Sequence, residues 1–169
     1  MDEEFTGKVY LYSLAVATYF APSDVSGIGG MLCKHIHSMH KWQNGPEQCD
    51  CVFVEHAEDI AGFCGMFTAQ VCTFTKFKYN SITYHCAIVK FFSTIGDLPC
   101  PNTSMWTVQQ DDEYDLVHID TIVCAAHLIG ITGKSIIPHG LLPSDTLNVF
   151  KTFYINKFID HHAFELAFW

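Results

Sequence analysis

Six cysteine and histidine side chains lie close together in the first third of the chain and could bind a metal ion. Cys33, His37 and His40 are spaced by four and three residues, which would place them on one face of a helix. A thiolate and imidazoles one or two helical turns apart can converge on one zinc ion. The alternative is a solvated polar face, because cysteine and histidine are frequent throughout the sequence. The candidate ligands are Cys33, His35, His37, His40, Cys49 and Cys51.

A second group is the triplet Asp160-His161-His162 near the end of the sequence. Metal-dependent phosphoesterases place an aspartate and two histidines on one divalent-metal cluster, so the triplet could belong to a hydrolase. Those enzymes need further aspartates on separate strand ends, and no upstream partner motif accompanies this triplet. The alternative is a helix terminus whose Asp and His bond to the backbone.

The remaining polar and aromatic candidates have simpler interpretations. His118 and Asp120 are two residues apart on a predicted strand, and His127 follows them; such residues are most often satisfied structural contacts. Trp106 belongs to a large set of aromatic residues that either pack the core or form a binding surface. The candidate binding residues are Trp106, His127, Asp160, His161 and His162. No complete catalytic motif is present, so we predict no enzyme activity, no cofactor and no tight zinc site.

Hydrophobic spacing predicts the elements that position these residues. Leu32, Ile36 and Met39 have the period of a short amphipathic helix over residues 31–42. The period then changes to that of strands, with Tyr79-Asn80-Ser81 as a hairpin turn. Leu147, Phe150 and Tyr154, behind the possible cap Ser144-Asp145, predict a closing helix. The five predicted strands cover residues 51–54, 67–72, 82–92, 105–108 and 116–123.

The predicted fold class is therefore α+β, a small, strongly bent β-sheet or barrel of about five strands. One domain spans residues 1–169, with a helical N-terminal segment (1–45), the sheet or barrel (46–130) and a C-terminal helix and tail (131–169). The 49% hydrophobic and 16% charged residues are typical of a folded domain. No apolar run reaches the length of a membrane span and the start is acidic, so we expect an intracellular protein with free thiols and no membrane contact.

The chain also resembles a known family. The runs Ala126-His127-Leu128-Ile129-Gly130 and Phe153-Tyr154-Ile155-Asn156-Lys157-Phe158 precede Asp160-His161-His162-Ala163-Phe164-Glu165. In order and spacing they resemble the C-terminal region of transposon-encoded proteins of mushroom-forming fungi, the Plavaka-type and KDZ-transposase-associated proteins. Upstream, Tyr84-His85-Cys86-Ala87 and Met105-Trp106-Thr107-Val108 extend the resemblance over nearly the whole chain. The resemblance implies a non-catalytic accessory or interaction domain, in the nucleus or cytoplasm.

Strand transfer by a transposase needs three carboxylates, on separate elements, that hold two metal ions. Here Asp111, Asp112, Glu113 and Asp115 cluster in one predicted loop. We therefore predict that this sequence lacks the catalytic core of a transposase. The partner that the resemblance implies is a protein, either the remainder of a transposon protein or a chromatin component.

The basic residues depart from that family. All nine are lysines, and the formal net charge is −9. Related sequences commonly have arginine near Cys33, His35, His37, Gln48, Cys64, Gln70 and Cys124, and CG-type arginine codons become Cys, His or Gln codons by single transitions. We therefore predict an eroded copy, in which arginine at these seven positions would raise the charge from −9 to −2. In its present form the chain should bind duplex DNA weakly or not at all.

Overall fold

The computed structural model describes residues 5–22, 28–41, 45–55, 65–133, 136–137 and 139–168. These residues are mostly β, and among them no helix is long and apolar enough to cross a membrane. The strands are β1 (Val9–Tyr12), β2 (Leu14–Phe20), β3 (Met31–Met39), β4 (Gln48–Cys49), β5 (Cys51–Glu55), β6 (Met66–Tyr79), β7 (Ile82–Thr94), β8 (Thr107–Gln110), β9 (Asp115–His118), β10 (Ile122–Ala126), β11 (Leu128–Gly130) and β12 (Thr152–Ile155). The helices are η1 (Ile119–Thr121), η2 (Pro143–Asp145), α1 (Thr146–Val149) and α2 (His161–Phe168).

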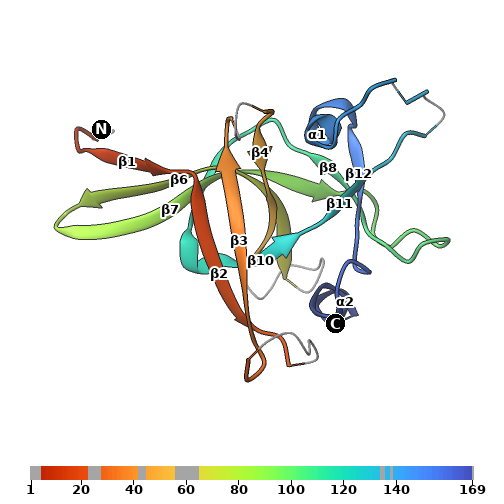
Figure 1. Cartoon of the computed structure of the whole chain (residues 1–169), viewed down its shortest axis with the longest axis horizontal. Helices are drawn as coiled ribbons and strands as arrows, with labels where there is room; N and C mark the ends of the chain where they lie inside the picture. The colour runs from red at the N-terminus through yellow and green to blue at the C-terminus, as the bar shows by residue number, and fades with distance from the viewer. Residues whose placement is uncertain are drawn as a thin grey trace.

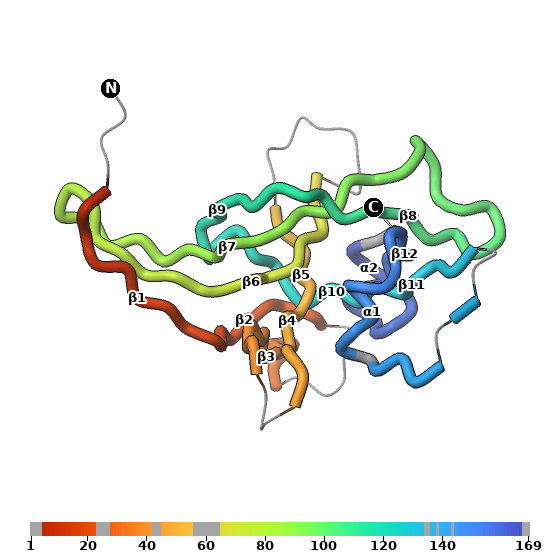
Figure 2. Tube along the Cα trace, turned by 90° about the horizontal axis from the view of Figure 1, so that it is seen from above, coloured from red at the N-terminus to blue at the C-terminus, as the bar shows by residue number. Residues whose placement is uncertain are grey.

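The main sheet is a nearly closed, barrel-like structure of seven strands (Figure 1). Its strand order is β10-β5-β6-β7-β8-β12-β11, and β1 and β9 pair with β6 and β7 beside this path. Only His127 separates β10 from β11, so the two ends of the path follow one another in the chain. A smaller sheet with the order β2-β3-β4 packs on one side of β5 and β6 (Figure 2).

The buried strand β5 separates two hydrophobic clusters. Side chains alternate between the faces of a strand, so Cys51 and Phe53 enter the barrel interior while Val52 and Val54 face the smaller sheet. Inside the barrel, Phe53 packs in the same cluster as Phe92 and Phe153. This arrangement explains why β5 has no polar residue before its last position.

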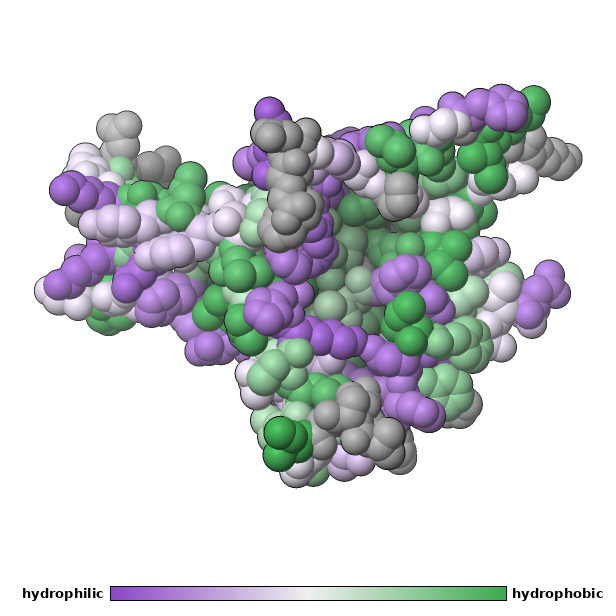
Figure 3. Space-filling model, viewed as in Figure 1, coloured by the Kyte–Doolittle hydropathy of each residue, from purple (hydrophilic) through white to green (hydrophobic). Residues whose placement is uncertain are grey.

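The hairpin of β6 and β7 is longer than the barrel and projects from it with β1 as a three-stranded arm (Figures 1 and 2). Its turn is formed by Asn80 and Ser81, which both have positive φ, at 46° and 66°. Two consecutive residues with positive φ fit the tight turn that joins twisted strands. The predicted hairpin at Tyr79-Asn80-Ser81 is confirmed. In Figure 3 the arm lies at the left and carries hydrophilic and hydrophobic side chains side by side.

The predicted helix over residues 31–42 is wrong, and with it the helical N-terminal segment. Met31–Met39 form β3, which pairs with β2 along its length. Leu32 and Ile36 are four residues apart, a spacing that puts them on one face of a helix and also on one face of a strand. Pairing with β2 decides between the two, and Ile36 becomes fully buried beneath it.

The predicted count of five strands is too low, because β11 and β12 were not expected. Leu147, Phe150 and Tyr154, expected in one helix, are distributed over α1, the connection after it and β12. The strand takes Phe153 and Ile155 into the core. A C-terminal helix is present, but it begins later, as α2.

Candidate functional site

The predicted metal ligands on β3 do not have the helical geometry on which that prediction depends. Cys33, His35 and His37 alternate along a strand and share its outward face, opposite Thr18, Val16 and Leu14 of β2. The imidazole rings of His35 and His37 are 6.4 Å apart between centroids. His40 is exposed and follows the end of the strand.

Other groups engage His37 and the two later cysteines. Asp50 accepts a hydrogen bond from the His37 backbone N–H at 2.8 Å and lies 2.9 Å from its Nδ1 atom. Burial raises the pKa of Cys51, and it raises that of Cys49 to about 11, with the charge of Glu47 adding to the effect. Neither thiol therefore ionises readily, as zinc binding requires. Within the described residues, no group of three or more His, Cys, Asp or Glu could hold a metal ion.

The triplet Asp160-His161-His162 is divided among three environments. Asp160 forms an ion pair with Lys34, and its Oδ1 atom accepts a hydrogen bond of 2.7 Å from the Ala163 N–H in the first turn of α2. His161 is exposed, whereas His162 is buried and stacks on Tyr19 with 4.5 Å between ring centroids. The triplet is thus an N-cap and an anchor of α2, and its three side chains do not converge.

The pKa values of this group follow from its partners. Burial would raise the pKa of Asp160, but hydrogen bonds from Lys34 and Ala163 outweigh burial and hold it below its usual range. Burial lowers the pKa of His162. A carboxylate held in its ionised form beside Lys34 of β3, and an imidazole whose pKa is lowered beside Tyr19 of β2, suit a structural contact between the smaller sheet and α2.

Trp106 and His127 both lie where strands meet β12. Trp106 is half-buried against the barrel interior, and its carbonyl accepts a hydrogen bond from the Ile155 N–H at 2.9 Å. The His127 carbonyl accepts a bond of equal length from the Asn156 N–H, and its Nδ1 atom lies 3.1 Å from Asn156 Nδ2. These contacts hold strands together, and the side chain of His127 remains exposed.

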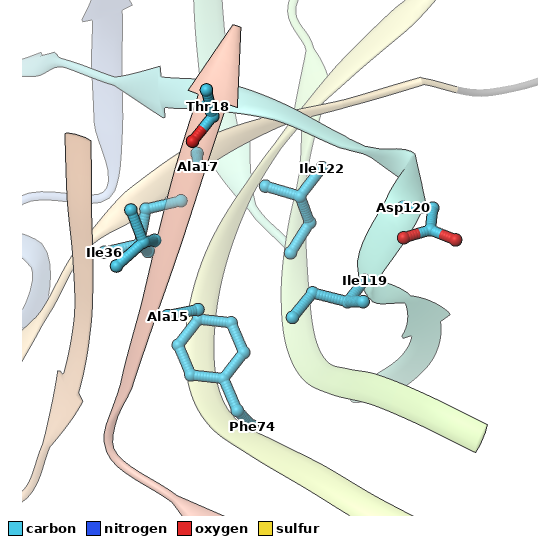
Figure 4. Close-up of a pocket in the computed structure, with 9 residues that line it drawn as sticks. Ala15, Ala17, Thr18, Ile36, Phe74, Ile119, Asp120 and Ile122 are labelled. Atoms are coloured by element: carbon cyan, nitrogen blue, oxygen red, sulfur yellow. The ribbon is translucent and has the colours of Figure 1, made fainter. Parts of the chain in front are cut away.

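The structure contains a site that the sequence analysis missed, a cleft of about 320 Å³ between the smaller sheet and η1, lined mainly by aliphatic and aromatic residues (Figure 4). The side chains of Ile36, Phe74, Ile119 and Ile122 gather around it, and Asp120 lies at its edge. The remaining lining residues are Ala15, Val16, Ala17 and Thr18 of β2. Four consecutive residues of one strand line the cleft, so the edge of β2 borders it as well as one face.

Small side chains keep this cleft open, and among the described residues β10 contacts β2 without forming strand hydrogen bonds to it. Ala15 and Ala17 point toward the apolar floor, where longer side chains would fill the space. Within the described part of the chain, β2 pairs with β3 alone. Asp120 is 83% exposed, and its Oδ2 atom lies 3.3 Å from His118 Nδ1. The alternating alanines of Leu14–Phe20 are the one signal in the sequence that could have pointed to an open strand face.

Comparisons of this chain with protein-family models, with curated proteins and with solved structures find no match. The resemblance to transposon-encoded proteins stays a prediction, and function has to be argued from this structure.

Proposed function

We propose that this chain is a non-catalytic interaction module that binds an extended segment of a protein partner along the free edge of β2. The observation that carries the proposal is the position of this edge beside the cleft. The candidate catalytic groups support a role without chemistry, because Asp160, His161 and His162 face three different environments.

An unpaired strand edge presents a row of backbone N–H and C=O groups to any chain that can pair with it. In strand addition, these backbone bonds supply affinity, and pockets for alternate side chains supply specificity. The cleft between β2 and η1 is such a pocket, since Ile119 and Ile122 form its far wall. A bound strand would place every second side chain in it.

The charges around the cleft indicate the composition of the partner. Asp120 lies at the rim, and the chain as a whole has a formal charge of −9. Opposite charge across an interface favours encounter and correct register. The bound segment should therefore alternate apolar residues with polar ones and carry lysine or arginine at a position that reaches Asp120.

The test is a selection of peptides from a random library displayed on phage, followed by fluorescence anisotropy with single peptides. Peptides with alternating apolar residues and a basic residue should be enriched. Two versions of each peptide are then made, one methylated at the odd and one at the even backbone nitrogens. One version should lose binding and the other should keep it, because only one set of peptide N–H groups faces β2. Equal effects in both versions would refute strand addition.

Two variants locate the binding site. Ala15→Phe fills the cleft and should weaken binding more than tenfold, provided that thermal unfolding shows a folded protein. Asp120→Lys changes an exposed residue and should weaken the binding of basic peptides by about two- to fivefold, as expected for a charge at the rim of an interface. Asp112→Lys makes the same charge change in the exposed loop before β9 and is the matched control. Binding that both variants leave unchanged would place the site elsewhere.

A further inference from the structure

The second unassigned surface is on the three-stranded arm, where charge is reversed relative to the rest of the molecule. The described residues 5–12 and 65–96 contain Lys8, Lys76, Lys78 and Lys90 and no aspartate or glutamate. The acidic residues Asp2, Glu3 and Glu4 lie outside the described residues. Against a total charge of −9, four of the nine lysines are thus gathered on the arm and the strands that continue it.

Strand register places Lys76 and Lys78 on one face with Tyr10 and Tyr12, and Lys8 lines the same face just before β1. Tyr10 pairs with Lys76, which pairs in turn with His85 on β7, and Tyr12 pairs with Phe74. A shallow depression of about 430 Å³ runs along this face. Its lining residues are Lys8, Tyr10, Tyr12, Lys76, Phe77, Lys78 and Thr83. We call the side of this depression that carries Lys8, Tyr10, Tyr12, Lys76 and Lys78 the cationic face of the arm.

The other face of the arm is aromatic and internally packed. Phe77 stacks on Tyr84 with 5.5 Å between ring centroids, and Phe5 meets Phe77 edge-on at the same distance. These contacts stiffen the arm. Consequently the cationic face is presented by a supported β-structure, although the arm stands clear of the barrel.

The cationic face is open. Tyr10 is 55% exposed and Tyr12 is 48% exposed. Among the described residues, Lys8, Lys76 and Lys78 have no ion-pair partner, and neither tyrosine ring has an aromatic or cationic neighbour. Buried aromatic rings need no further explanation, but exposed rings between unpaired cations require one.

We infer that the cationic face of the arm binds single-stranded nucleic acid. Lysines attract the phosphates, and exposed tyrosine rings offer stacking platforms for bases, a combination that tolerates any sequence. Lys76 and Lys78 are two residues apart on one strand, about 7 Å, which is comparable to the spacing of successive phosphates in an extended strand. In a duplex the bases are already stacked and the rings would find no partner.

This inference is independent of the proposed peptide site, since no residue lines both surfaces. It is also compatible with weak binding to duplex DNA. The acidic remainder of the molecule repels a long polyanion, whereas a short single strand can lie along the arm. The interaction should be modest in affinity and sensitive to salt.

The test is fluorescence anisotropy with labelled oligothymidylate and oligouridylate of about twelve nucleotides, a duplex of equal length and a strand of the same length without bases. At about 50 mM salt the single strands should bind, and the logarithm of the affinity should fall with the logarithm of salt with a slope near −2 for three phosphate contacts. The duplex and the strand without bases should bind at least fivefold more weakly.

Variants separate the two contributions. The double variant Lys76→Gln and Lys78→Gln should lose at least tenfold in affinity and reduce the slope to about −0.7. Tyr10→Ala and Tyr12→Ala should each weaken the single strand by about fivefold or more while leaving the strand without bases unchanged. The matched control, Lys41→Gln with Lys151→Gln, removes two exposed lysines away from the arm and should have no such effect.

Three results would overturn the inference. The first is no binding of single strands at low salt. The second is equal binding of the strand without bases, or of polyphosphate, with no loss on tyrosine substitution, which would indicate a simple anion site. The third is binding to phosphatidylserine vesicles, but not to oligonucleotides, that depends on Lys76 and Lys78; it would assign the arm to an anionic membrane surface.

Discussion

If Asp160 is a structural residue of α2 rather than a catalytic one, its two contacts should account for the whole effect of replacing it. Its Oδ1 atom caps the helix by accepting the Ala163 N–H at 2.7 Å, and its other oxygen pairs with Lys34. Loss of an N-cap costs about 1 kcal/mol. The ion pair is partly exposed, at 38% and 24% for the two side chains, so its contribution is about 0.5–1 kcal/mol after solvent screening.

Asp160→Ala removes both contacts and should lower the free energy of unfolding by about 2 kcal/mol, a decrease in Tm of about 4–8 °C for a chain of this size. Asp160→Ser keeps a capping oxygen and loses only the charge, so it should cost about 0.5–1 kcal/mol. Urea titration followed by circular dichroism measures each value. A double-mutant cycle with Lys34→Met isolates the pair.

The reasoning fails if Asp160→Ser is as destabilising as Asp160→Ala, because the cap would then contribute nothing. It also fails if neither variant changes stability. In that case a well-placed but structurally unimportant carboxylate beside His162 would favour the hydrolase alternative.

Three further predictions concern the interior, acid stability and thiol reactivity. Phe153 is 0% exposed in the barrel interior, so Phe153→Ala should lower the free energy of unfolding by about 3–5 kcal/mol. Phe20 is 62% exposed, and Phe20→Ala should lower it by about 0.5 kcal/mol in the same urea titration. Burial lowers the pKa of His162 in the folded state from 6.5, so the unfolded chain binds the proton more readily. The free energy of unfolding should therefore fall as the pH drops below 6.5. His162→Phe should remove this part of the pH dependence, whereas the control His161→Gln, at an exposed site, should keep it. Hydrogen bonds from Thr103 and the backbone of Asn102 lower the pKa of Cys100 to about 7. Iodoacetamide at pH 7 should therefore alkylate Cys100 before Cys49, Cys51 and Cys124, as mass spectrometry can measure. Slow labelling of Cys100 would show that these hydrogen bonds do not form in solution.

The sequence predicts those strands whose signal is local. Val52 and Val54 alternate with Cys51 and Phe53 in a short apolar run, and this run is a strand whichever face is buried. The hairpin turn is likewise contained in Asn80 and Ser81. A bent sheet or barrel follows from such local evidence, and the structure confirms it. The predicted α+β class overstated the helical content, because the described residues are mostly β.

The errors occur where tertiary pairing decides between two periods. Leu32 and Ile36 satisfy a helix and a strand equally, and only the pairing of Ala15 with Ile36 selects the strand. Phe153 and Ile155 look like the end of a helix that begins at Leu147, but they pair with β8 and β11 and fill the barrel. Local propensity contains no information about these distant partners.

The candidate surfaces were beyond prediction for a related reason. The cleft joins Ala15 and Ala17 to Ile119 and Ile122, about a hundred residues later in the chain. The cationic face depends on one register, in which Tyr10 meets Lys76. A shift of β1 by one residue along β6 would turn Tyr10 and Tyr12 to the aromatic face. Composition shows an acidic chain, and only the fold shows that its lysines are segregated.

The fold also gives the hypothesis of lost arginines a sharper form. Cys33 and His35 are exposed, so arginine at either position would be solvated and nearly neutral for stability. Cys124 differs, because it is 2% exposed in the barrel interior, where burial raises its pKa; Lys34 lowers this pKa and Asp160 raises it, both by less than burial does. A buried guanidinium is tolerated only with a carboxylate partner, and Asp160 is the carboxylate that acts on this position.

The change in stability caused by Cys124→Arg should therefore depend on Asp160, whereas the change caused by Cys33→Arg should not. If an ancestral arginine once paired with Asp160, then Cys124→Arg should be more destabilising in the Asp160→Ser background than in the unmodified chain, by about 1 kcal/mol or more in a double-mutant cycle. Cys33→Arg should give the same small change in both backgrounds, since it lies on the outward face of β3. A coupling energy of zero between positions 124 and 160 would mean that the barrel has no partner for an arginine there, and the hypothesis would then hold only for the exposed positions.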